Sequence, residues 1–305
     1  MADSEAMRVG ILGGGRWGQA LGRLVQAAGH QPFIAYEGKA PPHVLPSTDK
    51  PAEVTAACDL VLTAVSAAAL REAIGKARPH PGNRVVVAGR GIEPRTGVSL
   101  TDVVLQESDC VRVGALGGPA PVEEILNGGL CAGVVASPYD EVCRLTVSAL
   151  HSTRYRVYAS PDLVGLELVG AAVPVLACLL GLTRSLRGAG VGVHAVVLSR
   201  GLAELGRLAR AAGAQESTLF GLAGVGDLEA VHARPGAPYF DAGRSLADGK
   251  VVDGPWGLAE ALLATGEAHG VELPLVQSLV EVVGGGDPVD AIQRLMSRRS
   301  AKEHR

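Results

Sequence analysis

Clusters of cysteine and histidine that could cross-link the chain or hold a metal are missing from this sequence. Its five cysteines are odd in number and form no Cys-x-x-Cys pair. None of its eight histidines stands in a cluster that could supply three or four metal ligands. These absences exclude a disulfide scaffold and argue against a metal site. We therefore expect buried free thiols in a reducing cytoplasm at Cys58, Cys110, Cys131, Cys143 and Cys178.

An excess of charge of either sign is also missing. Lysine and arginine number 28 against 31 acidic residues, which leaves a formal net charge of −3. Such a balance gives no broad positive field for nucleic acid or anionic lipid. The first ten residues, MADSEAMRVG, carry acids where a signal peptide has a basic segment. We expect small-molecule ligands, no nucleic acid and no membrane partner, and a cytoplasmic location.

The sequence also lacks an apolar run long enough to cross a membrane. Its most apolar stretch, LVGAAVPVLACLLGL, covers residues 168–182, whereas a spanning helix needs about 20 apolar residues. Pro174 stands near the middle of this stretch and removes a helix hydrogen bond. We therefore expect residues 168–182 to form a buried core helix that bends or restarts at Pro174.

Short β-rich segments alternate with helical ones from residue 8 to about 159, the pattern of a parallel sheet covered by helices on both faces. The predicted strands are RVGIL, PFIAY, LVLTAV, RVVVAG, VRVGAL, AGVVAS and YRVYA. After Ser160-Pro161 this pattern stops, and Ala/Leu/Gly-rich helical segments follow. The sequence thus predicts an α/β fold, with a Rossmann-type doubly wound parallel sheet in residues 1–159 and an all-α domain in residues 160–305.

The segment VGILGGGRWGQALG has Gly-x-Gly-x-x-Gly spacing directly after a strand and at the start of a helix. In dinucleotide-binding folds these glycines make a tight turn, let the pyrophosphate approach the backbone and let the helix pack on the strand. A glycine turn that only packs, without a ligand, is the alternative. The expected cofactor-binding residues are Gly13, Gly15, Arg16, Trp17, Gly18 and Glu37.

Glu37 decides which dinucleotide we expect. It stands at the end of the second predicted strand, nineteen residues beyond Gly18. An acidic side chain at this place accepts hydrogen bonds from the adenosine ribose and repels a 2′-phosphate. We therefore expect NAD(H) to be favoured over NADP(H). Lys39 argues in the opposite direction, because it could reach such a phosphate.

Six collinear segments carry a resemblance over nearly the whole chain: GGGRWGQALG, VVVAGRGIEPRTG, LGGPAPVEEIL, YRVYASPDLVGLELVGAAV, SRGLAELGRLARAAGA and FGLAGVGDL. In these segments the sequence resembles the bacterial NAD(P)-dependent glycerol-3-phosphate dehydrogenases. The resemblance implies a Rossmann domain and a helical domain of the 6-phosphogluconate dehydrogenase C-terminal type, with a cleft between them. In that family hydride passes between nicotinamide and dihydroxyacetone phosphate or glycerol 3-phosphate, and homodimers are common.

The sequence departs from the family where the chemistry is expected. Where the family carries a catalytic lysine and an asparagine, in Glu-x-x-Gly-Ala-x-Lys-Asn, the present chain has Val173 and Pro174. The family's Ser-Arg-Asn aligns with Ala237-Pro238-Tyr239, and a threonine aligns with Val231. Hydride transfer needs a group that moves a proton and cations that hold a phosphate dianion. The resemblance therefore implies a divergent member that lacks its main catalytic groups.

Four polar side chains remain as candidates for binding or catalysis in the cleft: Arg90, Glu167, His194 and Asp227. Arg90 suits either a bound anion or an acidic partner at the end of its strand. Glu167 and Asp227 each stand at an expected helix start, where a carboxylate offsets the helix dipole without any chemistry. His194 exchanges protons near neutral pH, although a lone histidine is more often structural.

Three functions are compatible with this pattern. The first is a pseudo-dehydrogenase that binds NAD(H) and has a sensory or regulatory role with a protein partner. The second is an active NAD(P)-dependent oxidoreductase on another small hydroxy or keto compound, with a small anion in the cleft and Arg90, His194 or Glu167 in new roles. The third is an ordinary glycerol-3-phosphate dehydrogenase whose base comes from elsewhere. Loss of one charged transition-state partner costs about 10²–10³ in rate, so the combined losses favour the first.

Overall fold

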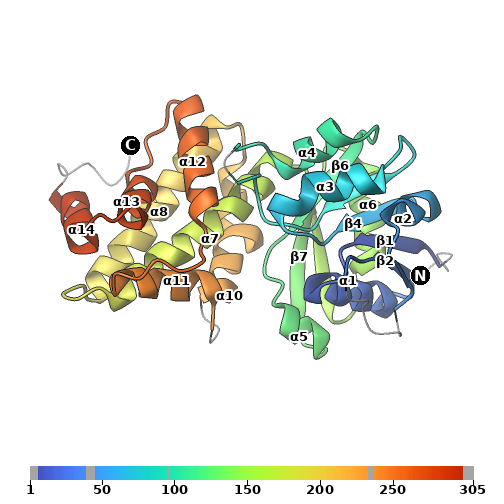
Figure 1. Ribbon diagram of the computed structural model, residues 1–305, viewed down its shortest axis with the longest axis horizontal. Coiled ribbons are helices and arrows are strands. Elements are labelled where there is room, and N and C mark those ends of the chain that lie inside the picture. The colour runs from blue at the N-terminus through green and yellow to red at the C-terminus, as the bar shows by residue number, and fades with distance from the viewer. Residues whose placement is uncertain (1–5, 39–44, 95, 233–235, 298–305) are drawn as a thin grey trace.

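The computed structural model describes residues 6–38, 45–94, 96–232 and 236–297. Figure 1 shows two bodies side by side, a sheet covered by helices and a bundle of helices. The last strand of the sheet is β8 (Tyr155–Ser160), and from α7 (Leu163–Ser185) onward the described residues form helices and turns without a strand. The prediction of an α/β fold followed by an all-α domain is confirmed.

Eight strands form one sheet in the order β3-β2-β1-β4-β5-β6-β7-β8. Neighbours from β3 to β6 are parallel, whereas β7 runs antiparallel to β6, and β8 is parallel to β7. All seven predicted strands are present, together with the short β3. The other bounds are β1 Arg8–Leu12, β2 Gln31–Ala35, β3 Ser47–Thr48, β4 Leu60–Thr63, β5 Arg84–Val87, β6 Arg112–Gly117 and β7 Cys131–Ala136.

The sheet departs from the expected parallel arrangement at β7. The connection from β6 contains only the five-residue helix α5 (Val122–Leu126). A helix of this length rises about 8 Å, whereas a six-residue strand is about 20 Å long, so it cannot carry the chain back along the sheet. The chain turns round instead. As a result, β7 and β8 begin at the edge where β1, β4, β5 and β6 end.

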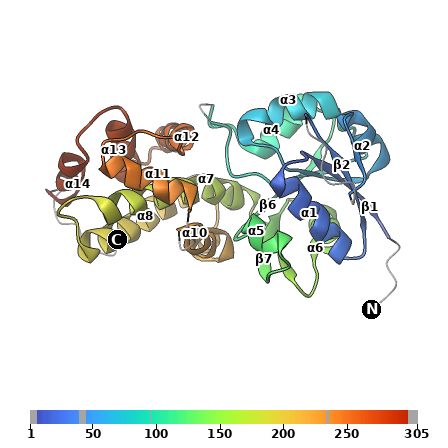
Figure 2. The ribbon, with the colours of Figure 1, turned by 60° about the horizontal axis from the view of Figure 1, so that its bottom comes forward.

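Helices cover both faces of the sheet, which is why its central strands are largely apolar. One layer consists of α1 (Arg16–Ala27) and α6 (Asp140–Leu150), and the other of α2 (Pro51–Ala57), α3 (Ala67–Ala77) and α4 (Leu100–Glu107). Figure 2 shows these two layers on opposite sides of the sheet. All four residues of β4 are buried, as expected for a strand that is covered on both sides.

Helix α7 is the core of the helical domain. Its length and hydropathy would suit a membrane span, but 83% of its most apolar window is buried inside the molecule. It packs against α8 (Val191–Ala211), α11 (Pro238–Ala247) and α12 (Trp256–Ala268). The prediction of a buried core helix is confirmed. A restart at Pro174 is wrong, because α7 continues through this residue; proline removes one backbone hydrogen bond, and the surrounding helices hold the turn in place.

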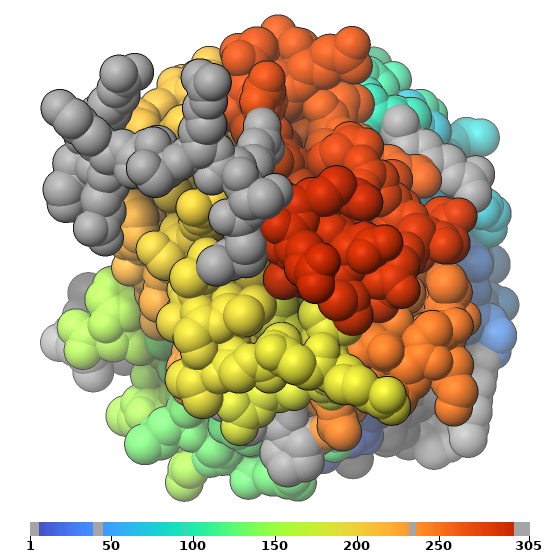
Figure 3. All heavy atoms as spheres, turned by 90° about the vertical axis from the view of Figure 1, so that its left-hand side faces the viewer, coloured from blue at the N-terminus to red at the C-terminus, as the bar shows by residue number. Residues whose placement is uncertain are grey.

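The remaining helices surround α7 and share its hydrophobic cluster, so this domain has a core of its own. Figure 3 looks onto the end of the domain, where segments coloured from yellow to red form the surface. The other bounds are α9 Glu216–Phe220, α10 Asp227–His232, α13 Pro274–Val283 and α14 Pro288–Ser297, with the π-helical turn η1 (Leu222–Gly226) between α9 and α10.

Candidate active site and cofactor groove

The three glycines after β1 occupy three different environments. Gly13 has a φ of 118°, in the left-handed region, and a Cβ there would meet the carbonyl oxygen of Ala64 at 2.6 Å. A Cβ on Gly18 would overlap the carbonyl oxygen of Gly13, because α1 packs directly on the loop. Nothing lies within 4 Å of the corresponding position on Gly15. The loop therefore has a tight turn, a close helix contact and one open approach to the backbone.

A groove of about 280 Å³ lies over this loop. It is lined by Gly13–Gly15, by Ala35–Glu37 at the end of β2 and by residues at the start of α3. No described side chain caps the first turn of α1, so its backbone N–H groups are available to a pyrophosphate. The open space at Gly15 and this uncapped helix end fit a nicotinamide dinucleotide.

Glu37 lines this groove, and its carboxylate is paired. Its Oε1 lies 2.6 Å from Nζ of Lys76 on α3. The same ammonium group lies 2.7 Å from Oε1 of Glu72. All three side chains are well exposed to solvent, so Lys76 offsets only part of the negative charge that Glu37 presents. Lys39, the residue expected to oppose a preference for NAD(H), lies outside the described residues.

Arg16 and Trp17, also predicted to bind the cofactor, point to different partners. The Nε of Arg16 donates a hydrogen bond of 3.1 Å to the carboxylate of Glu123 on α5. The indole Nε1 of Trp17 donates to the carbonyl oxygen of Ala88, just after β5, at 2.6 Å. The side chain of Trp17 also lines a second cavity, whereas Arg16 lines neither of the two described here.

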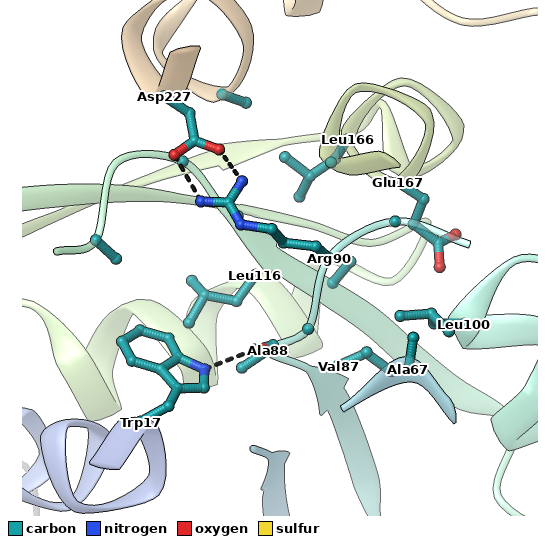
Figure 4. A pocket seen from close by; sticks show the side chains of 18 of the residues that line it. Trp17, Ala67, Val87, Ala88, Arg90, Leu100, Leu116, Leu166, Glu167 and Asp227 are labelled. Atoms are coloured by element: carbon teal, nitrogen blue, oxygen red, sulfur yellow. Dashed lines mark hydrogen bonds and ion pairs between the residues drawn. The ribbon is translucent and has the colours of Figure 1, made fainter. Parts of the chain in front are cut away.

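The second cavity, of about 480 Å³, lies between the two domains (Figure 4). Segments that follow β4, β5 and β6 form one wall, and α7, η1, α10 and α11 contribute the opposite wall. Ligands of doubly wound folds bind at this carboxyl edge of the sheet. Most of the wall is apolar, including Trp17, Val65, Val87, Ala88, Leu100, Leu116, Val122, Leu166, Val231, Pro238 and Leu258.

Arg90 and Asp227 both line this cavity, come from different domains and form a bidentate ion pair with each other (Figure 4). Nη2 of Arg90 lies 2.9 Å from Oδ1 of Asp227, and Nη1 bonds the other carboxylate oxygen. The Asp227 side chain is 2% exposed and that of Arg90 is 34% exposed. Of the two alternatives for Arg90, an acidic partner is therefore the one present. The carboxylate of Asp227 bonds this guanidinium rather than capping α10.

Glu167 caps a helix other than its own. Its Oε1 accepts a hydrogen bond from the backbone N–H of Thr101, and its Oε2 accepts one from the Thr101 hydroxyl, both at 2.8 Å. Thr101 belongs to the first turn of α4, whose N-cap is Ser99, whereas Asp162 caps α7. Burial raises the pKa of Glu167 to about 7, against the lowering effect of the Thr101 hydrogen bonds. Figure 4 shows its carboxylate turned toward Leu100 and away from Arg90.

Comparison with known proteins gives the family to which this architecture belongs. The family model described as NAD-dependent glycerol-3-phosphate dehydrogenase N-terminus matches residues 36–143, and the model for the C-terminus matches residues 162–294. The chain belongs to the NAD-dependent glycerol-3-phosphate dehydrogenase family. The resemblance found in the sequence is confirmed, and with it the use of a nicotinamide dinucleotide by the family.

Relatives in this family match over nearly the full length. Proteins named glycerol-3-phosphate dehydrogenase (NAD(P)+) from Bradyrhizobium sp. and Chlorobium limicola are each 32% identical. The first match covers 95% of this chain and 96% of the relative, and the second covers 97% and 99%. A crystal structure of glycerol-3-phosphate dehydrogenase from Coxiella burnetii has a TM-score of 0.85 at 24% identity, over 96% of this chain and 99% of that one. The last comparison shows a shared fold.

Val173, which the sequence resemblance aligns with a lysine of the family, is a core residue. Val173 is 3% exposed and belongs to the hydrophobic cluster of the helical domain. Gly170 and Glu167, on preceding turns of α7, line the cavity, whereas neither Val173 nor Pro174 does. Neither side chain can donate or accept a proton. Val173 therefore contributes to the packing of the helical domain and not to the described wall of the cavity.

His194 does not join the other three candidates. It lies on α8, half-buried, and its Nδ1 is 3.2 Å from the hydroxyl oxygen of Thr183 on α7. It is absent from the described residues that line the cavity. Arg90, Glu167 and Asp227 do line it, so the structure brings together three of the four predicted side chains.

Tyr155 is a residue of the cavity that sequence reasoning missed. It is 1% exposed, lines the cavity, and its hydroxyl has no hydrogen-bond partner among the described residues. It is the first residue of β8 and reaches the site only because β7 and β8 run opposite to β6. A strand expected to be parallel would have carried Tyr155 to the far edge of the sheet, so the sequence pattern gave no indication of its place.

Proposed function

We propose that this protein binds a nicotinamide dinucleotide and interconverts glycerol 3-phosphate and dihydroxyacetone phosphate at trace rates at most, with a sensory or regulatory role for the cofactor-bound form. One combination of observations supports the proposal. Val173, which the resemblance aligns with the family's lysine, is buried, and Arg90, the one cation among the described lining residues, is held by Asp227. The groove over the glycine loop retains the features that a dinucleotide needs.

The chemical argument concerns charge and protons. When bound, the nicotinamide supplies the carbon that gives or takes hydride. The protein must then move a proton at the substrate oxygen and balance a phosphate dianion. A phosphate dianion in the cavity would lie near the carboxyl groups of Asp227 and Glu167. The guanidinium of Arg90, which could bind it, is already paired with Asp227. Removal of one such partner costs about 10²–10³ in rate, so the loss of several predicts very slow turnover.

Glu37 supports a preference for NAD(H) over NADP(H). Its exposed carboxylate lines the groove, where it would accept hydrogen bonds from a ribose and repel a 2′-phosphate. Titration of protein fluorescence with NADH and with NADPH tests this preference. A homodimer is a further expectation from the resemblance, and static light scattering tests it. A cytoplasmic location is an expectation from the free cysteines and the acidic N-terminal residues.

The deciding experiment combines binding with a single turnover. NADH is titrated by fluorescence, and the same sample, at near-stoichiometric NADH, is mixed with dihydroxyacetone phosphate while absorbance of the reduced nicotinamide is followed. We expect binding without oxidation over many minutes. Rapid oxidation would contradict the proposal and would mean that another group replaces the missing base. Absence of NADH binding would also contradict the proposal, because the protein would then lack the cofactor on which its role depends.

An active oxidoreductase on a different small hydroxy or keto compound is the second candidate. One observation favours it: the interdomain cavity has a volume of about 480 Å³, which is enough for a small hydroxy or keto compound. Glu167, with a pKa of about 7, lines it and could exchange a proton near neutrality. A panel of uncharged and charged ketones, tested with NADH and NADPH, distinguishes the two candidates.

A further inference from the structure

The Tyr155 hydroxyl is a buried polar group that has no part in the cofactor groove or in the Arg90–Asp227 ion pair. The residue is 1% exposed and its hydroxyl finds no hydrogen-bond partner in the described part of the chain. Buried hydroxyls are bonded in most proteins, because an unbonded one costs free energy. Tyr155 also lines the interdomain cavity, so a molecule in that cavity is a candidate partner.

The geometry of the sheet places Tyr155 at the edge where the cavity lies. Tyr155 pairs with Cys131 at the start of β7, whereas Gly117, the last residue of β6, pairs with Val134. Tyr155 therefore lies beyond the end of β6. Its ring crosses β7 over Gly133, where a Cβ would overlap Oη of Tyr155 and would lie 3.3 Å from the carbonyl oxygen of Gly117. The absence of a side chain at Gly133 therefore leaves room for the hydroxyl of Tyr155, a residue that lines the cavity.

Tyr155 acts as a hydrogen-bond donor at neutral pH. Burial raises the pKa of its phenol, and the negative charge of Asp227 acts in the same direction. A phenol that keeps its proton donates to a carbonyl or hydroxyl oxygen. A ligand oxygen at this point would therefore satisfy a group that is otherwise left without a bond.

The rest of the cavity selects against charge. The described lining residues include one cation, Arg90, and two carboxylates, Asp227 and Glu167. Asp227 engages two nitrogens of the guanidinium, so Arg90 offers little to a second anion. The remaining surface is largely apolar, with Leu116 and Leu166 on opposite sides in Figure 4. An unpaired anion in such a place loses its hydration without replacement.

We propose that the interdomain cavity binds a small uncharged ketone or secondary alcohol, with its oxygen hydrogen-bonded to Tyr155 Oη and its carbon body against Leu116 and Leu166. The inference rests on the proposed function, because the ligand shares the cleft with the nicotinamide. It gives the cofactor-bound protein a ligand class that differs from the phosphate esters named for its relatives.

Calorimetric titration of the full chain, with and without saturating NADH, tests this proposal. The probes are cyclohexanone and cyclohexanecarboxylate, which share a ring and differ in charge, together with dihydroxyacetone phosphate. We expect cyclohexanone to bind and the carboxylate to bind at least about 10-fold more weakly. Tyr155→Phe should weaken cyclohexanone binding about 3- to 10-fold. The melting temperature of this variant should be equal to or above that of the wild type, since the substitution removes an unbonded hydroxyl.

Tyr158→Phe is the matched control, because Tyr158 lies on the same strand with 47% exposure. It should leave cyclohexanone binding unchanged. Equal affinity of wild type and Tyr155→Phe would overturn the proposal, as would tighter binding of either anion or no binding of cyclohexanone. Each of these three results would overturn the ligand proposal but not the proposed function, provided that NADH binds to the protein. Failure of NADH to bind contradicts the proposed function, and the titrations without cofactor then decide the ligand class separately.

Discussion

At the scale of single residues, the ion pair between Arg90 and Asp227 should be worth more to stability than any surface pair. Asp227 is 2% exposed, so Arg90→Ala leaves a buried carboxylate without its partner. We expect a loss of about 3–5 kcal/mol in the free energy of unfolding, measured by urea denaturation. The double variant Arg90→Ala/Asp227→Ala should lose much less than the two single variants combined.

An exposed pair provides the comparison for this prediction. Arg210 and Glu216 lie 2.9 Å apart with side chains 56% and 40% exposed. Arg210→Ala should cost less than about 1 kcal/mol, because water solvates the carboxylate that remains. Equal losses in Arg90→Ala and Arg210→Ala would mean that Asp227 is hydrated or protonated when its partner is gone.

Glu167 should make stability fall as the pH rises from mildly acidic to neutral. Its pKa in the folded protein is about 7, above the usual 4.5, because the carboxyl group is buried. Between these values the folded protein holds the proton and the unfolded chain does not. The contribution is therefore fully present below the unfolded pKa and is lost as the pH approaches 7, by about 3 kcal/mol in all.

Glu167→Gln tests this dependence, because the amide keeps the shape and does not titrate. The free energy of unfolding of the variant, relative to wild type, should rise between about pH 5 and about pH 8 in urea denaturation. Glu124→Gln, at an exposed position on α5, is the control and should show no such rise. A constant difference between Glu167→Gln and wild type would mean that the hydrogen bonds from Thr101 keep Glu167 ionised.

At the scale of elements, the contact between α7 and the loop after β5 depends on the absence of a side chain at Gly91. This residue has a φ of 75°, and a Cβ there would meet the backbone nitrogen and Cα of Ala171. Gly91→Ala should therefore lower the free energy of unfolding by at least about 3 kcal/mol, of which about 1–2 is the backbone conformation. Gly188→Ala separates the two effects, since Gly188 has a φ of 82° with nothing within 4 Å.

Denaturation of both glycine variants gives the comparison directly. Gly188→Ala should lose only the conformational part, about 1–2 kcal/mol. If the two variants lose equal amounts, then α7 can move away from the loop at little cost, and the close contact does not contribute to the fold.

The elements were largely predictable from sequence, whereas their directions and cross-contacts were not. Runs of β-branched residues and the glycine spacing depend on near neighbours, so seven strands and the dinucleotide loop could be located. The reversal at β7 depends on the length of α5, which the sequence pattern did not resolve. The pairing of Arg90 with Asp227 joins residues 137 positions apart, and the place of Tyr155 follows from the reversal. Both are consequences of tertiary packing.

At the scale of the whole molecule, three kinds of contact join the two domains. Leu166 and Ala223 of the helical domain form a buried cluster with Ala115 and Ala136 of the sheet. The ion pair of Arg90 with Asp227 connects the end of β5 to α10, and Glu167 on α7 caps α4. Apolar, ionic and capping contacts all lie around the cavity. Its shape therefore depends on both domains being folded at once.

These contacts predict that the protein unfolds in one cooperative transition, although chains with two domains often unfold in steps. Scanning calorimetry should give a single peak whose calorimetric and van't Hoff enthalpies agree. Leu166→Ala combined with Asp227→Asn weakens the apolar and ionic contacts without touching the core of either domain, and should broaden or divide the peak. Two peaks in the wild type would mean that one domain stays folded after the other has melted, so that the contacts around the cavity do not couple the two domains. A single narrow peak in the variant would mean that other contacts couple the two domains, such as the packing of α7 against the loop that contains Gly91.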